Sequence, residues 1–544
     1  MGGGLDSVQA ELRRAVHELS DRGLNSSSKW AAEQLTGIGR RPAAAVPPAV
    51  AVAINEGEAT DALLLARCYF QMREYMRASH VLEDAPGDKA RFLRLYALYL
   101  AGERRKDDQT LEESSSLADS YPAHVNNPQL KAVEAELREL HERDQLDGYA
   151  LYLYAVVLKQ LQRTPQVLEL LCAALHKEPT LWAAWLEVAA ACPDRDAVAR
   201  LSLPDHWMAH FFYAHVCLEL QQNTEAVTLY ERLSVTFPQS TYVLAQLATA
   251  HYQLREFDEA QARFEELLKA DPYRLDHVDT YSNILYVKES KRALSYVAHN
   301  AVAVDKYRPE TCCIVGNYYS LRAEHEKAVL YFQRALKLDR NYLSAWTLMG
   351  HEYVELKNTG AAIHAYRQAV EISPRDYRAW YALGQTYEIL QMPFYALFYY
   401  RKATALRPYD ARMWSALAGC YRLLNRRAEA IRCYERAESN DDREGIALQE
   451  LARLHHELAN DAQAATCYAR NLARRDAQQL EGADTIEALK YLAEHCKRAG
   501  KLEKAQPFCA RLLDCGRPQD VEEAKAMLRE IRSAMQTRSV APRK

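Results

Sequence analysis

The chain lacks any apolar run long enough to span a membrane. Its longest apolar stretch, residues 43–54, contains Pro47 and Pro48 and is far shorter than the roughly 20 residues that a spanning helix needs. The first residues lack the basic start and apolar core of a signal peptide, and Asp6 stands where a myristoylation signal has Ser or Thr. We therefore expect no membrane partner and a location in the nucleus and cytoplasm.

The sequence also lacks a strong charge bias and paired cysteines. Its 69 basic and 73 acidic side chains nearly balance, giving a net charge of −4 and no field that would attract a phosphate backbone. We therefore expect no nucleic acid partner. The 12 cysteines include no CxxC pair, so we expect small apolar residues on buried helix faces, without disulfides or a zinc site.

Common catalytic signatures are missing as well. No GxxxxGK[ST], GxSxG or HExxH stretch occurs, which excludes the commonest phosphate-binding, acyl-transfer and zinc-hydrolase motifs. We predict no catalytic residue, no cofactor and no metal site, and hence a protein that is not an enzyme.

What the sequence contains is a repeat of 34 residues. Tryptophans recur at this spacing, and each carries small and large residues at fixed distances after it. Small residues let two helices approach closely, large ones fill the space beside them, and a proline ends the second helix. The pattern predicts an all-α fold, a tetratricopeptide-repeat superhelical solenoid of antiparallel helix pairs. The predicted repeat core comprises Trp346, Gly350, Tyr353, Trp380, Gly384, Tyr387 and Trp414.

The repeat also predicts how the chain is divided. Residues 36–58 are rich in Pro, Ala and Gly, and residues 103–127 are polar, so both are predicted to lie outside the helix pairs. The predicted segments are an N-terminal helical segment (1–35), a linker (36–58), N-terminal repeats (59–145) with a polar loop (103–127), middle repeats (146–277), an irregular repeat (278–308), C-terminal repeats (309–475), a final repeat (476–531) and a flexible tail (532–544).

Stacked helix pairs form a concave groove lined by their first helices. In the C-terminal repeats the groove positions carry hydrogen-bonding side chains together with two acids, which suit an extended peptide containing an arginine. Several of these positions are Ser320, Ser344, Thr347, Arg378, Arg412, Ser415 and Arg422. The other groove positions are Asn317, His351, Glu355, Tyr381, Gln385 and Glu388.

Longer stretches resemble one known family. The run DKYRPETCCIVGNYYSLRAEHEKAVLYFQRALKLDRNYLSAWTLMGHEYVELKNT (305–359) and its continuation RDYRAWYALGQTYEILQMPFYALFYY (375–400) are similar to subunit eight of the anaphase-promoting complex, or cyclosome. The motifs SSKWAAE (27–33), LDGYALYLYAVVL (146–158), SLPDHWM (202–208) and DPYR (271–274) extend this resemblance over roughly residues 10–515.

The resemblance implies a non-catalytic scaffold subunit of a ubiquitin ligase that acts on mitotic regulators. It implies homodimers formed through the N-terminal repeats (59–145) and stacking with other repeat and scaffold subunits of the complex. It also implies that the groove of the C-terminal repeats (309–475) receives the C-box segment of an activator protein. The peptide-binding residues predicted on this basis are Asn317, His351, Glu355, Tyr381, Gln385 and Glu388, and we expect Glu388 to pair with an arginine of that segment.

Two other functions remain open at this stage. A co-chaperone would hold acidic peptide tails in a clamp of Lys, Asn and Arg; here only Asn317 stands in a clamp-like place, and Glu355 and Glu388 would repel such a ligand. An enzyme that uses its repeats only to recruit substrate would need a catalytic domain elsewhere, and residues 103–127 are too few to form one.

Overall fold

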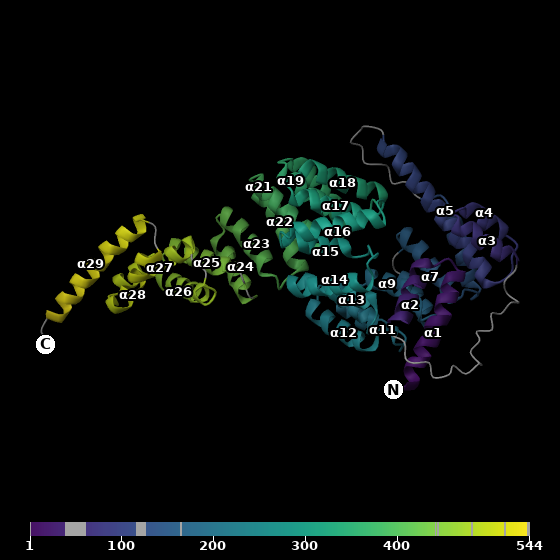
Figure 1. Cartoon of the computed structure of the whole chain (residues 1–544), viewed down its shortest axis with the longest axis horizontal. Helices are drawn as coiled ribbons and strands as arrows, with labels where there is room; N and C mark the ends of the chain where they lie inside the picture. The colour runs from purple at the N-terminus through teal and green to yellow at the C-terminus, as the bar shows by residue number, and fades with distance from the viewer. Residues whose placement is uncertain are drawn as a thin grey trace. The chain divides into compact units, whose positions relative to one another are not determined.

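The computed structural model describes residues 2–38, 61–115, 127–163, 166–440, 442, 445–479, 482–515 and 518–540. Over these ranges the secondary structure consists of helices, without strands, as the repeat predicts. The chain divides into two compact units, unit 1 (Met1–Lys288) and unit 2 (Glu289–Lys544), and Figure 1 labels their helices.

Unit 1 contains the helices α1 (Gly2–Asp21), α2 (Asn25–Gly37), α3 (Asp61–Gln71), α4 (Tyr75–Val81), α5 (Asp88–Ser115), α6 (Leu130–Glu142), α7 (Gly148–Gln160), α8 (Val167–Lys177), α9 (Trp182–Ala191), α10 (Arg195–Ala199), α11 (Met208–Glu219), α12 (Asn223–Thr236), α13 (Thr241–Leu254), α14 (Phe257–Ala270) and α15 (Val278–Val287).

Unit 2 contains the helices α16 (Lys291–Val304), α17 (Pro309–Leu321), α18 (His325–Leu338), α19 (Leu343–Glu355), α20 (Thr359–Ile372), α21 (Tyr377–Ile389), α22 (Pro393–Leu406), α23 (Ala411–Leu423), α24 (Arg427–Ser439), α25 (Ile446–Glu457), α26 (Asp461–Ala477), α27 (Ala483–Arg498), α28 (Leu502–Cys515) and α29 (Pro518–Val540).

The turn inside each helix pair keeps the 34-residue spacing. A residue with left-handed backbone (φ between 52° and 65°) closes the first helix, and the second helix begins two residues later. Except at Glu289, the N–H of the next residue donates to the carbonyl oxygen five residues before it, as Met392 does to Tyr387 (2.9 Å), which satisfies the end of the first helix. These turn residues are Gln221, Arg255, Glu289, Ala323, Lys357, Gln391, Asn425 and Ala459.

Glycines in the first helices of unit 2 let a ring of the second helix approach. A Cβ atom on Gly350 would lie 2.4 Å from the Tyr366 ring, and one on Gly384 would lie 2.5 Å from the Tyr400 ring. Both rings are fully buried, so they fill the space that the missing side chains leave.

The repeat tryptophans are half-buried, and they tie one helix pair to the preceding loop. The indole N–H of Trp346 donates to the Arg340 carbonyl (2.8 Å), and Trp380 and Trp414 donate to the carbonyls of Pro374 (2.9 Å) and Pro408 (2.7 Å). In each case the acceptor lies six residues earlier. The tryptophan therefore satisfies a backbone carbonyl at the end of the previous second helix.

The other predicted core residues lie at the same pair contacts. Tyr387 is buried and its ring stacks on Tyr399, with 5.2 Å between centroids. Tyr353 is half-buried, and its hydroxyl accepts a hydrogen bond from Gln333 (3.2 Å). The core of unit 2 is thus built from contacts that recur in each repeat.

Two segment predictions were wrong in part. Residues 103–115 of the predicted polar loop form the last turns of α5, and residues 532–540 of the predicted flexible tail lie within α29. Residues 103–115 are rich in Glu and Arg, and residues 532–540 include Arg, Ala, Met and Gln. These residue types are good helix formers, so polar stretches of this kind can form a helix. The rest of the loop, 116–126, and most of the predicted linker lie outside the described residues.

The predicted irregular repeat, 278–308, is divided between the units. Its first helix, α15, has 10 residues, whereas α13 has 14 and α17 has 13. Its turn residue Glu289 nevertheless keeps the 34-residue spacing. The first helix is therefore shortened at its start, after the segment that includes Pro272.

Within the described ranges, no helix combines the length and hydropathy that crossing a membrane requires. Each of the eleven cysteines that the structure describes is a free thiol, and seven of them are buried. Burial raises the pKa of the Cys420 thiol to about 12. The seven buried thiols confirm the predicted packing role, whereas Cys68 is exposed, so the prediction was wrong for that residue.

Candidate functional site

A pocket of about 560 Å³ opens between α19 and α21 of unit 2, on the face formed by the first helices of successive pairs, here called the first-helix face. Figure 1 shows these two helices side by side. Most lining residues come from α19 and α21, one comes from α20, and one is the turn residue after α21. They are His351, Val354, Glu355, Tyr366, Ala382, Gln385, Thr386, Glu388, Ile389 and Gln391.

The structure brings four of the six predicted peptide-binding residues together in this pocket: His351, Glu355, Gln385 and Glu388. The other two do not line it. Asn317 is only 3% exposed, and the half-buried Tyr381 ring packs on Tyr400, with 5.5 Å between centroids. Whether the pocket binds a peptide stays a prediction.

His351 is held as a neutral ring. Its Nδ1 atom lies 2.8 Å from the Tyr366 hydroxyl, which donates because burial raises the pKa of Tyr366 and keeps the phenol protonated. The surrounding protein atoms, and next the Arg378 guanidinium, lower the pKa of His351 to about 4. The side chain retains solvent access through the pocket mouth, so it presents an uncharged hydrogen-bonding edge to a ligand.

Glu388 is oriented by the residue beneath it. The Tyr400 hydroxyl donates to Glu388 Oε2 (2.8 Å), and burial and the carboxylate together raise the pKa of Tyr400 far above its ordinary value. The phenol therefore stays a donor and fixes one carboxylate oxygen. The other oxygen can accept from a ligand.

The pocket is acidic. Its lining includes the carboxylates of Glu355 and Glu388 and no Lys or Arg. Apolar contacts come from Val354, Ala382 and Ile389. A guanidinium with an apolar neighbour fits this mixture, because two carboxylates and several neutral acceptors surround a partly apolar floor.

Six lining residues were not predicted from the sequence: Val354, Tyr366, Ala382, Thr386, Ile389 and Gln391. Tyr366 stands at the position of the buried ring in the repeat pattern. The pattern therefore predicted a core residue and did not indicate that its hydroxyl reaches the pocket. Ile389 lies four residues after Gln385, on the same side of α21, and helical spacing could have found it.

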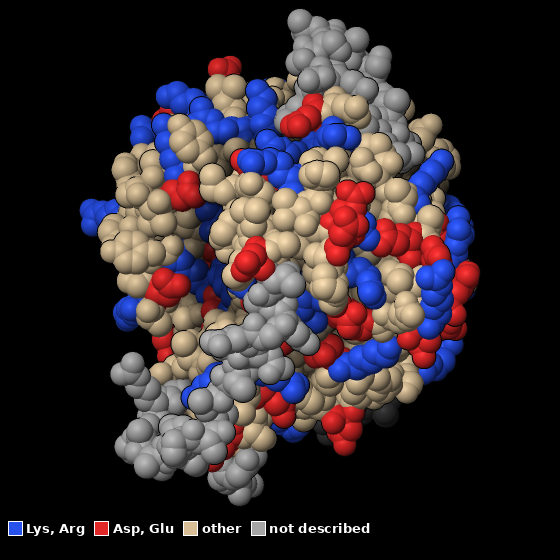
Figure 2. Space-filling view, turned by 90° about the vertical axis from the view of Figure 1, so that its right-hand side faces the viewer, with Lys and Arg blue, Asp and Glu red and all other residues tan. Residues whose placement is uncertain are grey.

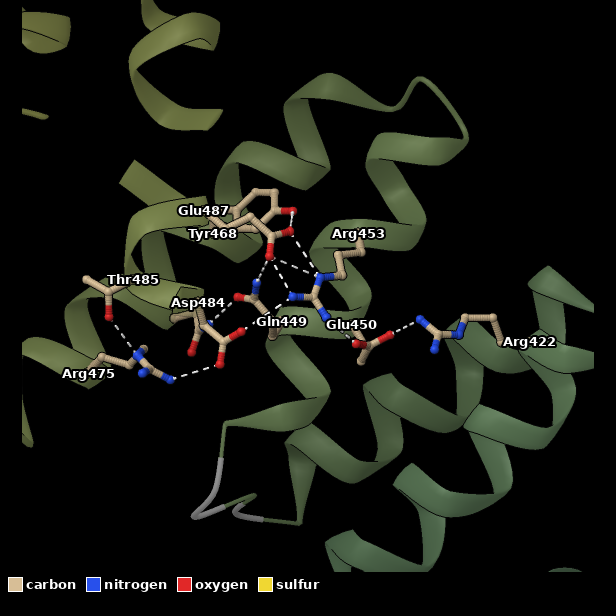
Figure 3. A network of polar contacts seen from close by, with 10 residues as sticks. Arg422, Gln449, Glu450, Arg453, Tyr468, Arg475, Asp484, Thr485 and Glu487 are labelled. Carbon is tan, nitrogen blue, oxygen red and sulfur yellow. Dashed lines mark hydrogen bonds and ion pairs between the residues drawn. The ribbon is translucent and has the colours of Figure 1, made fainter. Parts of the chain in front are cut away.

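Further along unit 2, charged side chains on the first-helix face pair with one another. Figure 3 shows Arg453 of α25 between Glu450 and Glu487, with donor–acceptor distances of 2.7 Å to Glu450 and 3.0 Å from Nε to Glu487. Tyr468 also donates to Glu487 (2.9 Å). Arg453 lies 68 residues, or two repeats, after Gln385 and therefore holds the equivalent position in its helix pair. The position that lines the pocket at Gln385 thus carries an ion-paired arginine in α25.

In unit 1 the first-helix face is covered by α2. The Trp30 ring stacks on Trp182 of α9, with centroids 4.6 Å apart, and meets Phe211 of α11 and Tyr242 of α13 edge-on at 5.3 and 5.8 Å. Trp30 is 5% exposed. The α1–α2 pair is thus part of the core of unit 1 and not a separate N-terminal segment.

Polar contacts hold the α1–α2 pair in place. The guanidinium of Arg22 lies 3.2 Å from Asp147 and over the Tyr149 ring at 3.9 Å. Glu11 accepts from the Trp207 indole (2.9 Å), and Lys29 pairs with Asp276 (2.6 Å). The partners are 125, 196 and 247 residues apart in the sequence, so the α1–α2 pair is held by segments far along unit 1.

The described residues contain no group of three or more His, Cys, Asp or Glu side chains arranged to hold a metal ion. The pocket and the network therefore offer charge and hydrogen bonds as their chemistry.

Comparison with known proteins adds a family. A family described as anaphase promoting complex subunit 8 / Cdc23 matches residues 7–250, and tetratricopeptide repeat families match residues 246–279, 309–342, 350–390, 377–410 and 414–445.

Several named relatives match. The anaphase-promoting complex subunit 8 of Arabidopsis thaliana is 47% identical, covering 96% of each chain, and that of Dictyostelium discoideum is 42% identical, covering 66% of this chain and 70% of the relative. The cell division cycle protein 23 homolog of Homo sapiens is 46% identical over 54% of this chain and 49% of the relative.

Among solved structures, the APC/C hetero-tetramer Cut9-Hcn1 matches with a TM-score of 0.56 and covers 96% of both chains. The sequence identity is 17%, so this likeness concerns the fold alone.

Proposed function

Because the chain belongs to the anaphase-promoting complex subunit 8 / Cdc23 family, we propose that it is a non-catalytic scaffold subunit of that ubiquitin ligase, acting in the nucleus and cytoplasm. In this role it binds other repeat and scaffold subunits and supports ubiquitination of mitotic regulators. Scaffolding needs no reaction in this chain, because holding partners at fixed distances raises their effective concentration.

The pocket between α19 and α21 is the proposed site for the C-box segment of the activator. The observation that carries this is the acidic lining, in which Glu388 is fixed by Tyr400 at 2.8 Å beside Gln385 and the neutral His351. A peptide arginine would pair with Glu388, and the apolar floor would take a neighbouring side chain. A clamp for acidic tails needs Lys or Arg in this place, and the lining contains neither.

The test is charge reversal at Glu388. We expect Glu388→Arg to weaken the binding of a synthetic C-box peptide to the full chain at least about tenfold, because truncating or reversing a buried charge pair costs about 2–5 kcal/mol. Fluorescence anisotropy measures the affinity. Glu371→Arg is the matched control, since Glu371 is an exposed acid on the second helix α20 and does not line the pocket. Equal affinity of Glu388→Arg and wild type would show that the assignment is wrong.

Homodimerisation is the second part of the proposal, and α3 and α4 support it. The exposed apolar side chains of Leu64, Leu65 and Met76 on these helices, and of Met72 in the turn between them, suit burial against a second copy. Figure 2, which faces the right-hand side of Figure 1, shows uncharged areas among side chains of both signs. Sedimentation equilibrium of the full chain tests this part, and a monomer throughout the micromolar range would contradict it.

A further inference from the structure

Helix α22 carries exposed aromatic side chains on the side opposite to the pocket. Phe394 is 74% exposed and Phe398 is 54% exposed, with Tyr395 exposed beside them. Tyr400 of the same helix is buried and faces Glu388. Residues two apart on a helix point about 200° apart, so Phe398 and the pocket lie on opposite sides of α22.

The repeat does not require these aromatics. At the register of Phe394 the neighbouring second helices carry small or charged residues, namely Glu326, Gly360, Ala428 and Ala462. At the register of Phe398 they carry Leu330, His364, Arg432 and Thr466. All eight positions are exposed. Only α22 of these five helices has phenylalanine at both, so the exposed rings are a property of this helix and not of the fold.

The aromatic rings are held in a fixed arrangement. Tyr399 stacks on Tyr387 at 5.2 Å with 5° between the ring planes, and Phe398 meets Tyr399 edge-on at 5.2 Å. Tyr395 also stacks on Tyr387 (5.4 Å). A row of mutually packed rings loses little conformational freedom on binding, which favours a contact surface.

The charge beside the rings is positive. Helix α22 contains Arg401 and Lys402 and no acidic residue, and Lys402 lies 6.0 Å from the Phe398 ring centroid. In the described part of the chain no carboxylate pairs with either cation, although ion pairs are common on the rest of the surface. Arg367 of α20 adds a third cation, which donates to the Tyr387 hydroxyl (2.9 Å).

We propose that this surface, Phe394, Tyr395, Phe398, Arg401 and Lys402, binds an acidic amphipathic helix of a partner protein. The residues Phe394, Phe398 and Lys402 follow one another at intervals of four, so they form a ridge that fits between side-chain rows of a second helix. Acidic side chains of that helix meet Arg401 and Lys402. Self-association through this face is disfavoured, because a two-fold contact would bring like charges together.

Site-specific photo-crosslinking of the native assembly tests the proposal. A tagged full-length chain carrying benzoylphenylalanine in place of Phe398 is purified with its bound partners and irradiated, and the crosslinked peptides are identified by mass spectrometry. We expect a segment of another protein with net negative charge and apolar residues at helical spacing. The matched control carries benzoylphenylalanine at Thr466, which is exposed in the same register on α26; it should not crosslink to that segment.

Charge reversal separates this surface from the pocket. The double variant Arg401→Glu/Lys402→Glu should lower the crosslinked fraction at least about fivefold while the C-box peptide binds as in wild type. The proposal is overturned if position 398 crosslinks no more than position 466, if the segment is neutral or basic or belongs to a second copy of this chain, or if charge reversal leaves the yield unchanged. Failure of the C-box assay alone would refute the proposed function and leave this surface standing.

Discussion

The two units build their first-helix faces from the same repeat, yet one face is covered and the other holds a pocket. In unit 1 the α2 helix lies on α9, α11 and α13, with Trp30 among four aromatic rings. In unit 2 the face between α19 and α21 is open to solvent through a pocket of about 560 Å³. The fold therefore does not decide whether this face is a core or a binding site.

The difference lies in a few side chains at equivalent positions. Ten residues before the left-handed turn residue, α11 of unit 1 has Phe211, whereas in unit 2 α19 has Thr347 and α21 has Tyr381. Thirteen residues before it, unit 1 has Tyr242 where unit 2 has Ser344 and, one repeat later, Arg378. Phe211 and Tyr242 gain free energy because the Trp30 ring removes their apolar surface from water, whereas Arg378 at the position of Tyr242 stays exposed in unit 2.

Removing the Trp30 side chain should destabilise the packing of α2 on the first-helix face of unit 1. We expect this change to have the largest effect on stability. Trp30→Ala deletes a nearly buried ring from an aromatic cluster and should lower the free energy of unfolding of unit 1 by about 3–5 kcal/mol. Hydrogen exchange should then show lost amide protection in α1 and α2 and little change in α19 to α22.

Lys29→Ala is the control for this change. Lys29 is exposed on the same helix and pairs with Asp276 at 2.6 Å, and an exposed ion pair contributes about 0–1 kcal/mol. If Trp30→Ala leaves the exchange of α2 as slow as in wild type, α2 is not a structural part of unit 1.

Helix spacing provides a second, smaller contrast between the units. Gly384→Ala places a methyl group 2.5 Å from the Tyr400 ring. This overpacking lowers the free energy of unfolding by about 1–3 kcal/mol, whereas the higher helix propensity of Ala raises it by about 1 kcal/mol. We expect a net loss of stability and weaker C-box peptide binding, because Tyr400 orients Glu388.

In unit 1 the equivalent residue is Ala248, which lies in the register of Gly350 and Gly384. The reverse change, Ala248→Gly, should lower stability by about 1 kcal/mol through the helix alone and leave peptide binding unaffected. Thermal unfolding and anisotropy measure both variants. A Gly384→Ala protein with unchanged melting temperature and affinity would contradict the close-approach argument.

The neutral His351 predicts a modest pH dependence that is specific to the pocket. The fold lowers its pKa from the ordinary 6.5 to about 4, so the unfolded chain takes up this proton first as the pH falls. The stabilising contribution of the neutral ring is complete above about pH 6.5 and is lost as the pH drops toward about 4.

His351→Gln removes this titration. Between about pH 7 and about pH 5, the melting temperature of wild type should therefore fall more than that of the variant. Differential scanning fluorimetry measures both. The solvent access of His351 keeps the shift small. A constant difference across this range would show that the ring is not held neutral.

Much of the fold followed from the sequence, because each helix pair repeats local contacts. The packing contacts between paired helices require a fixed spacing, and the sequence shows it at Gly350, Gly384, Tyr387 and the repeat tryptophans. The error at residues 103–115 came from composition, since polar residues suit an exposed helix as well as a loop.

The candidate site was predicted less completely. His351, Glu355, Gln385 and Glu388 were found because polar residues at groove positions stand out from the repeat. Asn317 shares the register of His351 and Gln385 and is nevertheless buried, so the register alone does not reveal which residues line the pocket.

The sequence by itself determined that helices pair and stack, because a 34-residue spacing of small and large side chains reports contacts between neighbours in the chain. Only the tertiary structure decided which first-helix face is open. Trp30 meets Trp182 across about 150 residues of chain, and Arg22 meets Asp147 across a separation of 125. Contacts between such distant segments do not recur along the chain and therefore leave no repeating pattern. The stretches SSKWAAE and SLPDHWM both hold the α1–α2 pair to unit 1, but the sequence alone does not reveal this role.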